Sequence, residues 1–231
     1  MWQRLPDTGG LKSMNKIEDA FKNKKAFIPF VTAGDPSLDV TRELILAMQE
    51  AGADLIEIGI PFSDPVAEGP VIQEADDRAL SAGVTTDKIF DTVDDIADKI
   101  HVPIVFMTYI NPIYVYGVEK FAKRAKACGA AGVIVPDVPF EEKEEIRGSF
   151  EAEGLVVISM VAPTSADRVR MIAKEAKGFL YCVSSLGVTG VRTEIGTAIG
   201  DLIQTVKEEC SIPCAIGFGI STPEQAEAMA K

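Results

Sequence analysis

Histidine is almost absent from this sequence: His101 is the only one among 231 residues. Metal sites with several histidine ligands are therefore excluded, and a histidine-based catalytic triad could draw only on this one residue. The four cysteines lack the paired spacing of zinc sites or of small disulfide frameworks, so we expect reduced thiols. No run approaches the roughly 20 apolar residues that span a bilayer, and residues 1–13 contain no apolar core of a secretory signal. We therefore expect a cytoplasmic protein without membrane segments.

Basic residues are also few, with 23 Lys and Arg against 35 Asp and Glu and a formal net charge of −12. They form no cluster, which argues against a protein that binds nucleic acid or an anionic membrane. Apolar residues make up 47% of the chain, enough to build the core of a globular α/β domain.

Short apolar segments alternate with amphipathic ones along most of the chain. Near-continuous apolar runs are typical of buried parallel strands, and apolar residues spaced by three and four indicate helices. The predicted strands are 26–31, 55–60, 104–109, 132–135, 155–161, 179–183 and 213–217. The predicted helices are 38–51, 86–99, 118–128, 141–153, 166–177 and 198–210, with a further helix beginning near Thr222 and Pro223.

Seven strand–helix units favour a (β/α)₈ TIM barrel over a doubly wound sheet. A Rossmann fold is disfavoured because Thr222 stands where the third glycine of a fingerprint starting at Gly217 belongs. We expect one TIM-barrel domain over residues 14–231 that lacks the eighth β/α unit, with a helix at 14–22 closing the barrel floor and a disordered extension at 1–13. Without that unit, the first and seventh strands would have unpaired edges, and we expect lower stability and activity.

In such barrels the active site lies at the C-terminal ends of the strands, whereas His101 precedes its strand on the opposite side. Glu57 interrupts the apolar run LIEIGI near the end of the second predicted strand. Burial would raise the pKa of this carboxyl toward neutrality, as a general acid or base requires. A structural hydrogen bond or a buried ion pair is the alternative.

Three loops after predicted strands also have functional features. Residues 61–70 (PFSDPVAEGP) combine three prolines and a glycine with two carboxylates, which indicates a shaped loop, although either carboxylate could be a helix cap or a solvated charge. The glycine-rich segments 186–190 (LGVTG) and 217–221 (GFGIS) follow the sixth and seventh strands. Late barrel loops commonly bind phosphate through exposed backbone N–H groups, so a phosphorylated substrate is a reasonable hypothesis.

Several motifs occur in the order found in one known family. They are FVTAGDP at 30–36, EIGIPFSDP at 57–65 followed by GPVIQ at 69–73, YINP at 109–112, PDVP at 136–139, GVTG at 187–190 and GFGIS at 217–221. From residue 14 to residue 231 the chain resembles the α subunit of tryptophan synthase. This family cleaves indole-3-glycerol phosphate to indole and glyceraldehyde 3-phosphate by a retro-aldol reaction in tryptophan biosynthesis.

The resemblance implies roles for two carboxyl groups. Glu57 matches the acid/base residue, which protonates C3 of the indole and helps to remove the proton of the adjacent glycerol hydroxyl. Glu68 matches a second carboxylate that assists at the indole N–H. The family usually has Asp there, so the pose of the longer Glu68 side chain is a departure from the pattern.

The resemblance also implies binding residues and a partner. Positions that match the substrate pocket are Phe30, Tyr109 and Tyr181, and those that match phosphate contacts are Gly190, Phe218 and Gly219. Positions that match the β-subunit interface are Asp64, Asn111 and Pro139. The chain is expected to need no metal or cofactor of its own, and its β partner in an α2β2 heterotetramer would carry pyridoxal phosphate.

Three other functions remain open at this point. The chain could be a lone lyase that releases free indole, or a non-catalytic fragment or activator that binds the β subunit. It could also be a sugar-phosphate isomerase on the same fold, which explains the apolar pocket around Phe30 and Tyr109 less well.

Overall fold

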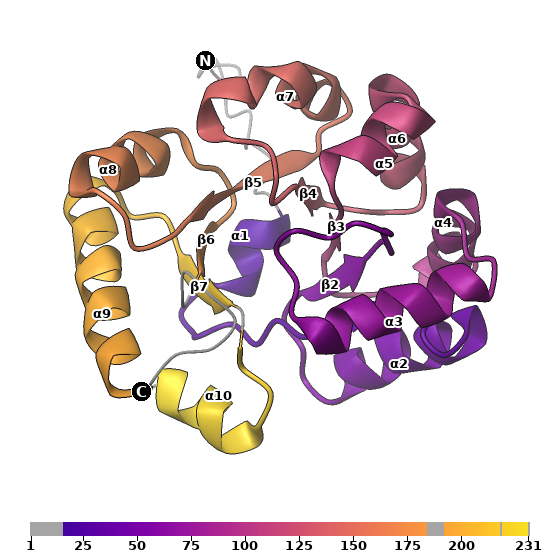
Figure 1. Ribbon diagram of the computed structural model, residues 1–231, viewed down its shortest axis with the longest axis horizontal. Helices are drawn as coiled ribbons and strands as arrows, with labels where there is room; N and C mark the ends of the chain where they lie inside the picture. Colours follow the sequence, from indigo (N-terminus) through magenta and orange to yellow (C-terminus); the bar gives the residue numbers. More distant parts are fainter. Residues whose placement is uncertain (1–15, 184–191, 218, 231) are drawn as a thin grey trace, which may run out of the picture.

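The computed structural model describes residues 16–183, 192–217 and 219–230. Seven parallel strands curve around a common centre, and helices form a ring outside them (Figure 1). The predicted disordered extension at 1–13 lies outside the described residues. The expected class, an α/β barrel with seven of the eight units, is confirmed by this arrangement.

The strands pair in sequence order, β1-β2-β3-β4-β5-β6-β7, all parallel. Within the described residues no ladder joins β7 to β1. All seven predicted strands are confirmed, although most are shorter at their ends than the apolar runs. Their bounds are β1 Phe30–Thr32, β2 Ile56–Gly59, β3 Ile104–Met107, β4 Gly132–Ile134, β5 Val156–Val161, β6 Leu180–Val183 and β7 Cys214–Gly217.

The predicted helices are present, and two more were not predicted. The helices that follow the expected pattern are α1 Lys16–Ala20, α2 Leu38–Glu50, α4 Thr86–Asp94, α6 Val118–Ala127, α7 Glu144–Ala152, α8 Ala166–Glu175, α9 Arg192–Glu209 and α10 Pro223–Met229. Short 3₁₀ turns, η1 Ala97–Lys99 and η2 Phe140–Glu142, replace regular helix where longer ones were predicted. The additional helices are α3 Pro70–Ser81, which follows the loop after β2, and α5 Ile110–Tyr116, which begins shortly after β3.

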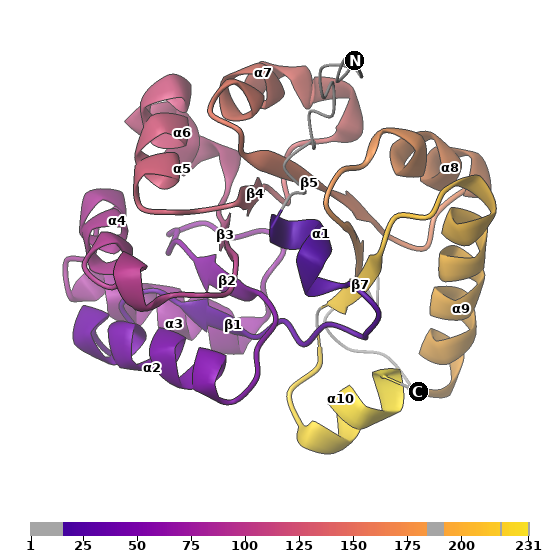
Figure 2. The same cartoon turned by 180° about the vertical axis from the view of Figure 1, so that it is seen from behind.

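Helix α1 covers one end of the strands, as predicted for the helix that closes the barrel floor (Figure 2). Its Ile17 is fully buried and packs with Leu55, Phe179 and other residues of the barrel interior. This contact fills the end of the barrel at which the strands begin. The opposite end, where the strands finish, is left for the loops that carry the candidate site.

Successive side chains along a strand pack in two different hydrophobic cores, one between the strands and the helices and one inside the barrel. On β2, Ile56 and Ile58 pack outward with helix residues such as Ile45 and Phe90. Leu55 packs inward with Ile17 and Val105. Because successive side chains of a strand point to opposite faces, the residue two positions after Leu55 also faces the interior. That residue is Glu57.

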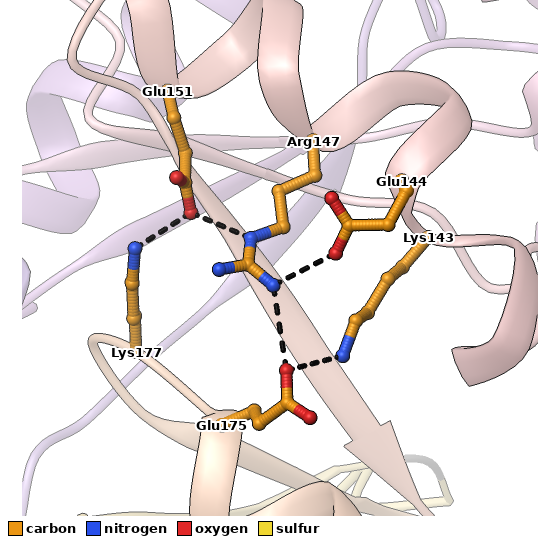
Figure 3. Close-up of polar contacts among 6 residues, drawn as sticks. All are labelled: Lys143, Glu144, Arg147, Glu151, Glu175 and Lys177. Carbon is orange, nitrogen blue, oxygen red and sulfur yellow. Dashed lines mark hydrogen bonds and ion pairs between the residues drawn. The ribbon is translucent and has the colours of Figure 1, made fainter.

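An ion-pair network links α7 to the end of α8 on the outside of the barrel (Figure 3). Arg147 is central: its Nε lies 2.9 Å from Glu151 Oε1, and its Nη1 lies 2.9 Å from Glu144 Oε1 and 3.4 Å from Glu175 Oε2. Lys143 and Lys177 complete it, each with Nζ 2.7 Å from the carboxylate of Glu175 or Glu151 respectively. These groups are partly exposed, so each pair stabilises the fold by no more than about 1 kcal/mol.

His101 is exposed just before β3, where its backbone N–H donates to Gln49 Oε1 at 2.5 Å. All four cysteines lie in the described residues and are free thiols. Among the helices that the structure describes, none combines the length and apolarity of a membrane span.

Candidate active site

Glu57 is a buried acid within β2, with only 4% of its surface exposed. Its neighbours in the sheet register are Phe30 on β1 and Val105 on β3, both of which belong to the interior core. Burial in these apolar surroundings raises the pKa of the Glu57 carboxyl to about 8. At neutral pH the group is therefore mostly protonated and able to donate a proton.

Two aromatic rings lie beside the strand ends because glycine leaves space for them. A Cβ atom added to Gly59 would lie 2.5 Å from Phe30 Cζ, and one added to Gly217 would lie 2.0 Å from Tyr181 Oη. Real Cβ atoms do not approach other atoms so closely, so the rings occupy the volume that larger residues at these positions would fill. Phe30 is half-buried and Tyr181 is buried. The two rings thus line the same interior as Glu57.

Glu68 lies in the loop between β2 and α3, where Tyr109 holds it. The Tyr109 hydroxyl donates to Glu68 Oε2, and the same hydroxyl accepts from the Ala67 N–H at 2.9 Å. The Phe62 ring packs on Tyr109 with 5.3 Å between centroids. Tyr109, for which the family resemblance implies a place in the pocket wall, thus also holds this loop through Glu68 and Ala67.

The Glu68 carboxyl is poised to titrate near neutrality. Burial is the main cause that raises its pKa to about 7, and the nearby charges of Asp76 and Asp137 raise it further. Backbone hydrogen bonds at Ala67 and Glu68 act in the opposite direction by stabilising the carboxylate. The site therefore contains two carboxyls whose pKa values burial raises toward neutrality, as proton transfer at neutral pH requires.

Asp76 on α3 is an acid of this region that sequence reasoning missed. Its side chain is 6% exposed, and burial raises its pKa to about 6 against a hydrogen bond from the Phe62 N–H, which lowers it. Behind it, Asp35 accepts from Arg78 Nε at 2.8 Å and from Arg78 Nη2 at 2.9 Å. On a helix, Asp76 shares a face with Ala75 and Ala79, which are both buried. That position could have predicted the burial of Asp76, but only if α3 had first been predicted as a helix.

A second side chain that sequence reasoning missed is Thr32, at the end of β1. It is buried, and among the described residues its Oγ1 has no hydrogen-bond partner. By contrast, the side chain of Asp137, which follows β4, has a hydrogen-bond partner: its Oδ1 accepts from the Ile110 N–H at the start of α5, at 2.9 Å. Nothing in the sequence distinguished Thr32 from an ordinary strand threonine.

The residues expected to contact a partner are all on the surface near the strand ends. Asp64, Asn111 and Pro139 are exposed and follow β2, β3 and β4 respectively. Gly219, expected at the phosphate, is exposed after β7 and has a left-handed φ of 74°. The other two expected phosphate contacts, Gly190 and Phe218, lie outside the described residues.

Comparisons with known proteins identify the family of this chain. Residues 17–231 match the family model of the tryptophan synthase alpha chain. The chain is 48% identical over 217 residues to the tryptophan synthase alpha chain of Lacticaseibacillus casei, covering 94% of this chain and 82% of that protein. It is 49% identical over 220 residues to that of Halalkalibacterium halodurans, covering 94% and 83%.

Solved structures lead to the same family. The alpha chain from Legionella pneumophila superposes with a TM-score of 0.81 at 36% identity, covering 93% of this chain and 80% of that one. A chain of the tryptophan synthase complex from Pyrococcus furiosus gives 0.79 at 37% identity, covering 89% and 82%. The chain belongs to the tryptophan synthase alpha chain family.

Proposed function

We propose that this protein cleaves indole-3-glycerol phosphate to indole and glyceraldehyde 3-phosphate, the α reaction of tryptophan synthase. It is a carbon–carbon lyase of tryptophan biosynthesis. The observation that carries the proposal is Glu57, a carboxyl with a pKa of about 8, buried within β2 of a barrel in a chain of this family.

The reaction begins with proton transfer from Glu57 to C3 of the indole. Protonation at C3 turns the ring into an iminium ion that accepts electrons. The Glu57 carboxylate then removes the proton of the glycerol hydroxyl next to the ring. As the new C=O forms, the C–C bond breaks, its electron pair returns to the ring, and indole and the aldehyde separate. Glu57 regains its proton in this step, so the same group is the acid and the base.

Glu68 stabilises the charge that develops on the ring nitrogen. Protonation at C3 makes the indole N–H more acidic and more positive, so a carboxylate acceptor binds it more strongly in the transition state than in the ground state. Tyr109 orients Glu68, and a pKa of about 7 leaves a large fraction of the group ionised at neutral pH.

The substrate's two ends need different surroundings. The rings of Phe30, Tyr109 and Tyr181 supply apolar walls for the indole. Backbone N–H groups of the loops containing Gly190, Phe218 and Gly219 hold the phosphate. Because the retro-aldol step uses the indole ring itself as the electron acceptor, this chain needs neither a cofactor nor a metal for it.

The partner is the β subunit, in an α2β2 assembly that consumes the indole with pyridoxal phosphate held by that subunit. The surface around the strand ends supports this docking. Exposed apolar side chains occur in the segments that follow β2 and β3: Val66 (82%) in the loop after β2, Val71 (74%) on α3 and Val115 (83%) on α5. Exposed apolar residues gathered near polar ones are typical of a protein interface.

Indole release from purified chain and indole-3-glycerol phosphate tests the function directly. We expect the released indole to match the glyceraldehyde 3-phosphate formed, and the rate to rise when β subunit is added. Equal rates with and without β would identify a lone lyase. No indole under either condition, with β activation retained, would identify a non-catalytic activator and overturn the proposal.

Replacing Glu68 separates its catalytic role from a loop role. Glu68→Ala should lower kcat more than it raises KM, because the N–H bond strengthens in the transition state. Glu68→Asp should keep most of the activity, since the family usually has Asp at this position. Steady-state kinetics measures both effects. An Ala variant with unchanged kcat would reduce Glu68 to a structural loop residue.

A further inference from the structure

Tyr109 connects the loop that carries Glu68 to the end of β3. Its hydroxyl donates to Glu68 Oε2 and accepts from the Ala67 N–H at 2.9 Å. The ring is buried and packs on Phe62 of the same loop, with 5.3 Å between the ring centroids. The position of the Glu68 carboxyl therefore depends on the direction in which the Tyr109 side chain points.

Tyr109 is also the N-cap residue of α5. The first N–H groups of a helix have no partner within the helix, and the N-cap side chain commonly supplies an acceptor for one of them. The Tyr109 side chain makes no such capping hydrogen bond. Its hydroxyl instead contacts the Glu68 loop, so α5 needs an acceptor from another part of the chain.

Asp137, in the loop after β4, supplies that acceptor. Its Oδ1 accepts from the N–H of Ile110, the first residue of α5, at 2.9 Å and across 27 positions of sequence. A carboxylate is well suited to this place, because the N-terminus of a helix favours negative charge. The Ile110 N–H belongs to the same planar peptide unit as the Tyr109 carbonyl, so the bond fixes the backbone directly after Tyr109.

We infer that Asp137 is a positioning residue for Glu68: it caps α5 at Ile110, fixes the direction of the Tyr109 side chain, and through Tyr109 holds the Glu68 carboxyl in place. The loops that follow β2, β3 and β4 are thus joined by one series of hydrogen bonds. The inference rests on the proposed function for its effect on kcat, but not for its effect on the loop itself.

Two substitutions of Asp137 isolate the hydrogen bond. The amide oxygen of Asp137→Asn still accepts from the Ile110 N–H, whereas Asp137→Ala has no acceptor. Both variants lose the charge, so the difference between them measures the hydrogen bond alone. We expect kcat for indole release by Asp137→Ala to lie about 10-fold below that of Asp137→Asn, with a smaller change in KM, because Glu68 acts chiefly in the transition state.

A double-mutant cycle tests whether Asp137 acts through Tyr109. Tyr109→Phe keeps the ring but loses the hydroxyl that holds Glu68, and it should lower kcat by at least as much as Asp137→Ala does. Asp137→Ala added to Tyr109→Phe should then lower kcat by less than about twofold more, since the contact it supports is already lost. Full multiplication of the two effects would overturn the inference.

Thr85→Ala is the matched control for the loss of a helix cap. Thr85 is the N-cap residue of α4, and its Oγ1 accepts from the Lys88 N–H at 3.4 Å. This variant should lose stability in urea unfolding, as a missing cap does, but keep the wild-type kcat. A fall in kcat equal to that of Asp137→Ala would show that any lost cap has this effect, and would overturn the inference.

Hydrogen exchange of the Ala67 amide, followed by NMR in the absence of substrate, reports the loop directly. Exchange should be about 10-fold faster in Asp137→Ala and in Tyr109→Phe than in the wild type, and unchanged in Asp137→Asn and Thr85→Ala. Wild-type exchange of Ala67 in Asp137→Ala would overturn the inference. Failure of the proposed function is distinct, since it removes indole release from every variant and leaves the exchange of Ala67 informative.

Discussion

Glu57→Gln is expected to lower indole release by about 10²–10⁴-fold while the protein stays folded. Glutamine has nearly the same shape as protonated Glu57, but its amide neither donates a proton to C3 nor accepts one from the glycerol hydroxyl. The measurement is kcat for purified protein with β subunit present. Glu43→Gln, an exposed change on α2, is the matched control and should keep full activity. Near-normal turnover of Glu57→Gln would remove the acid/base assignment.

The Glu57→Gln substitution should also change how the free energy of unfolding depends on pH. The Glu57 pKa is about 8 in the folded protein and near 4.5 when exposed in the unfolded chain. Between these values the folded state binds a proton that the unfolded state has released. Stability therefore falls as pH rises through this range, by up to about 1.4 kcal/mol per unit for this group. Glu57→Gln lacks the loss and should become more stable than the wild type toward pH 8, as urea unfolding at several pH values would measure.

The strands were predictable because each is a short apolar run with clear boundaries. Of the two helices that were missed, α3 follows the proline-rich loop after β2, and α5 begins shortly after β3. Gly69 caps α3 without a side-chain hydrogen bond. Helix α5 has only seven residues and starts at Ile110, directly after the buried Tyr109. In both cases tertiary contacts rather than periodicity determine the helix.

The candidate site was predictable where one residue breaks a pattern. Glu57 is an acid within an apolar strand, and this contrast is visible in the sequence alone. Asp76 is one of three acids on α3, with Glu74 and Asp77, and carries no such contrast. Its burial depends on how α3 lies against the loop at Phe62, which no local pattern encodes. The contact of Tyr109 with Glu68 joins residues 41 positions apart and could not be read from spacing either.

Gly132→Ala is expected to destabilise the fold by about 1–3 kcal/mol or more. Gly132 starts β4 and pairs in register with Val156 on β5. An added Cβ would lie 2.5 Å from the Val156 carbonyl oxygen and 3.2 Å from Cδ1 of Ile17. The first of these is a backbone atom, so the conflict is relieved only if the two strands separate. The second belongs to the residue of α1 that fills this end of the barrel.

Gly148→Ala is the matched control for this prediction. Gly148 lies on the exposed side of α7, and an added Cβ would meet no atom within 4 Å. Alanine also favours a helix over glycine, so this variant should gain about 0.5–1 kcal/mol. Urea unfolding of both variants compares the same chemical change at a crowded and an open position. A Gly132→Ala variant that unfolded at the wild-type urea midpoint would contradict the prediction. It would mean that β4 and β5, and Ile17 beside them, can accept a side chain at position 132 without cost.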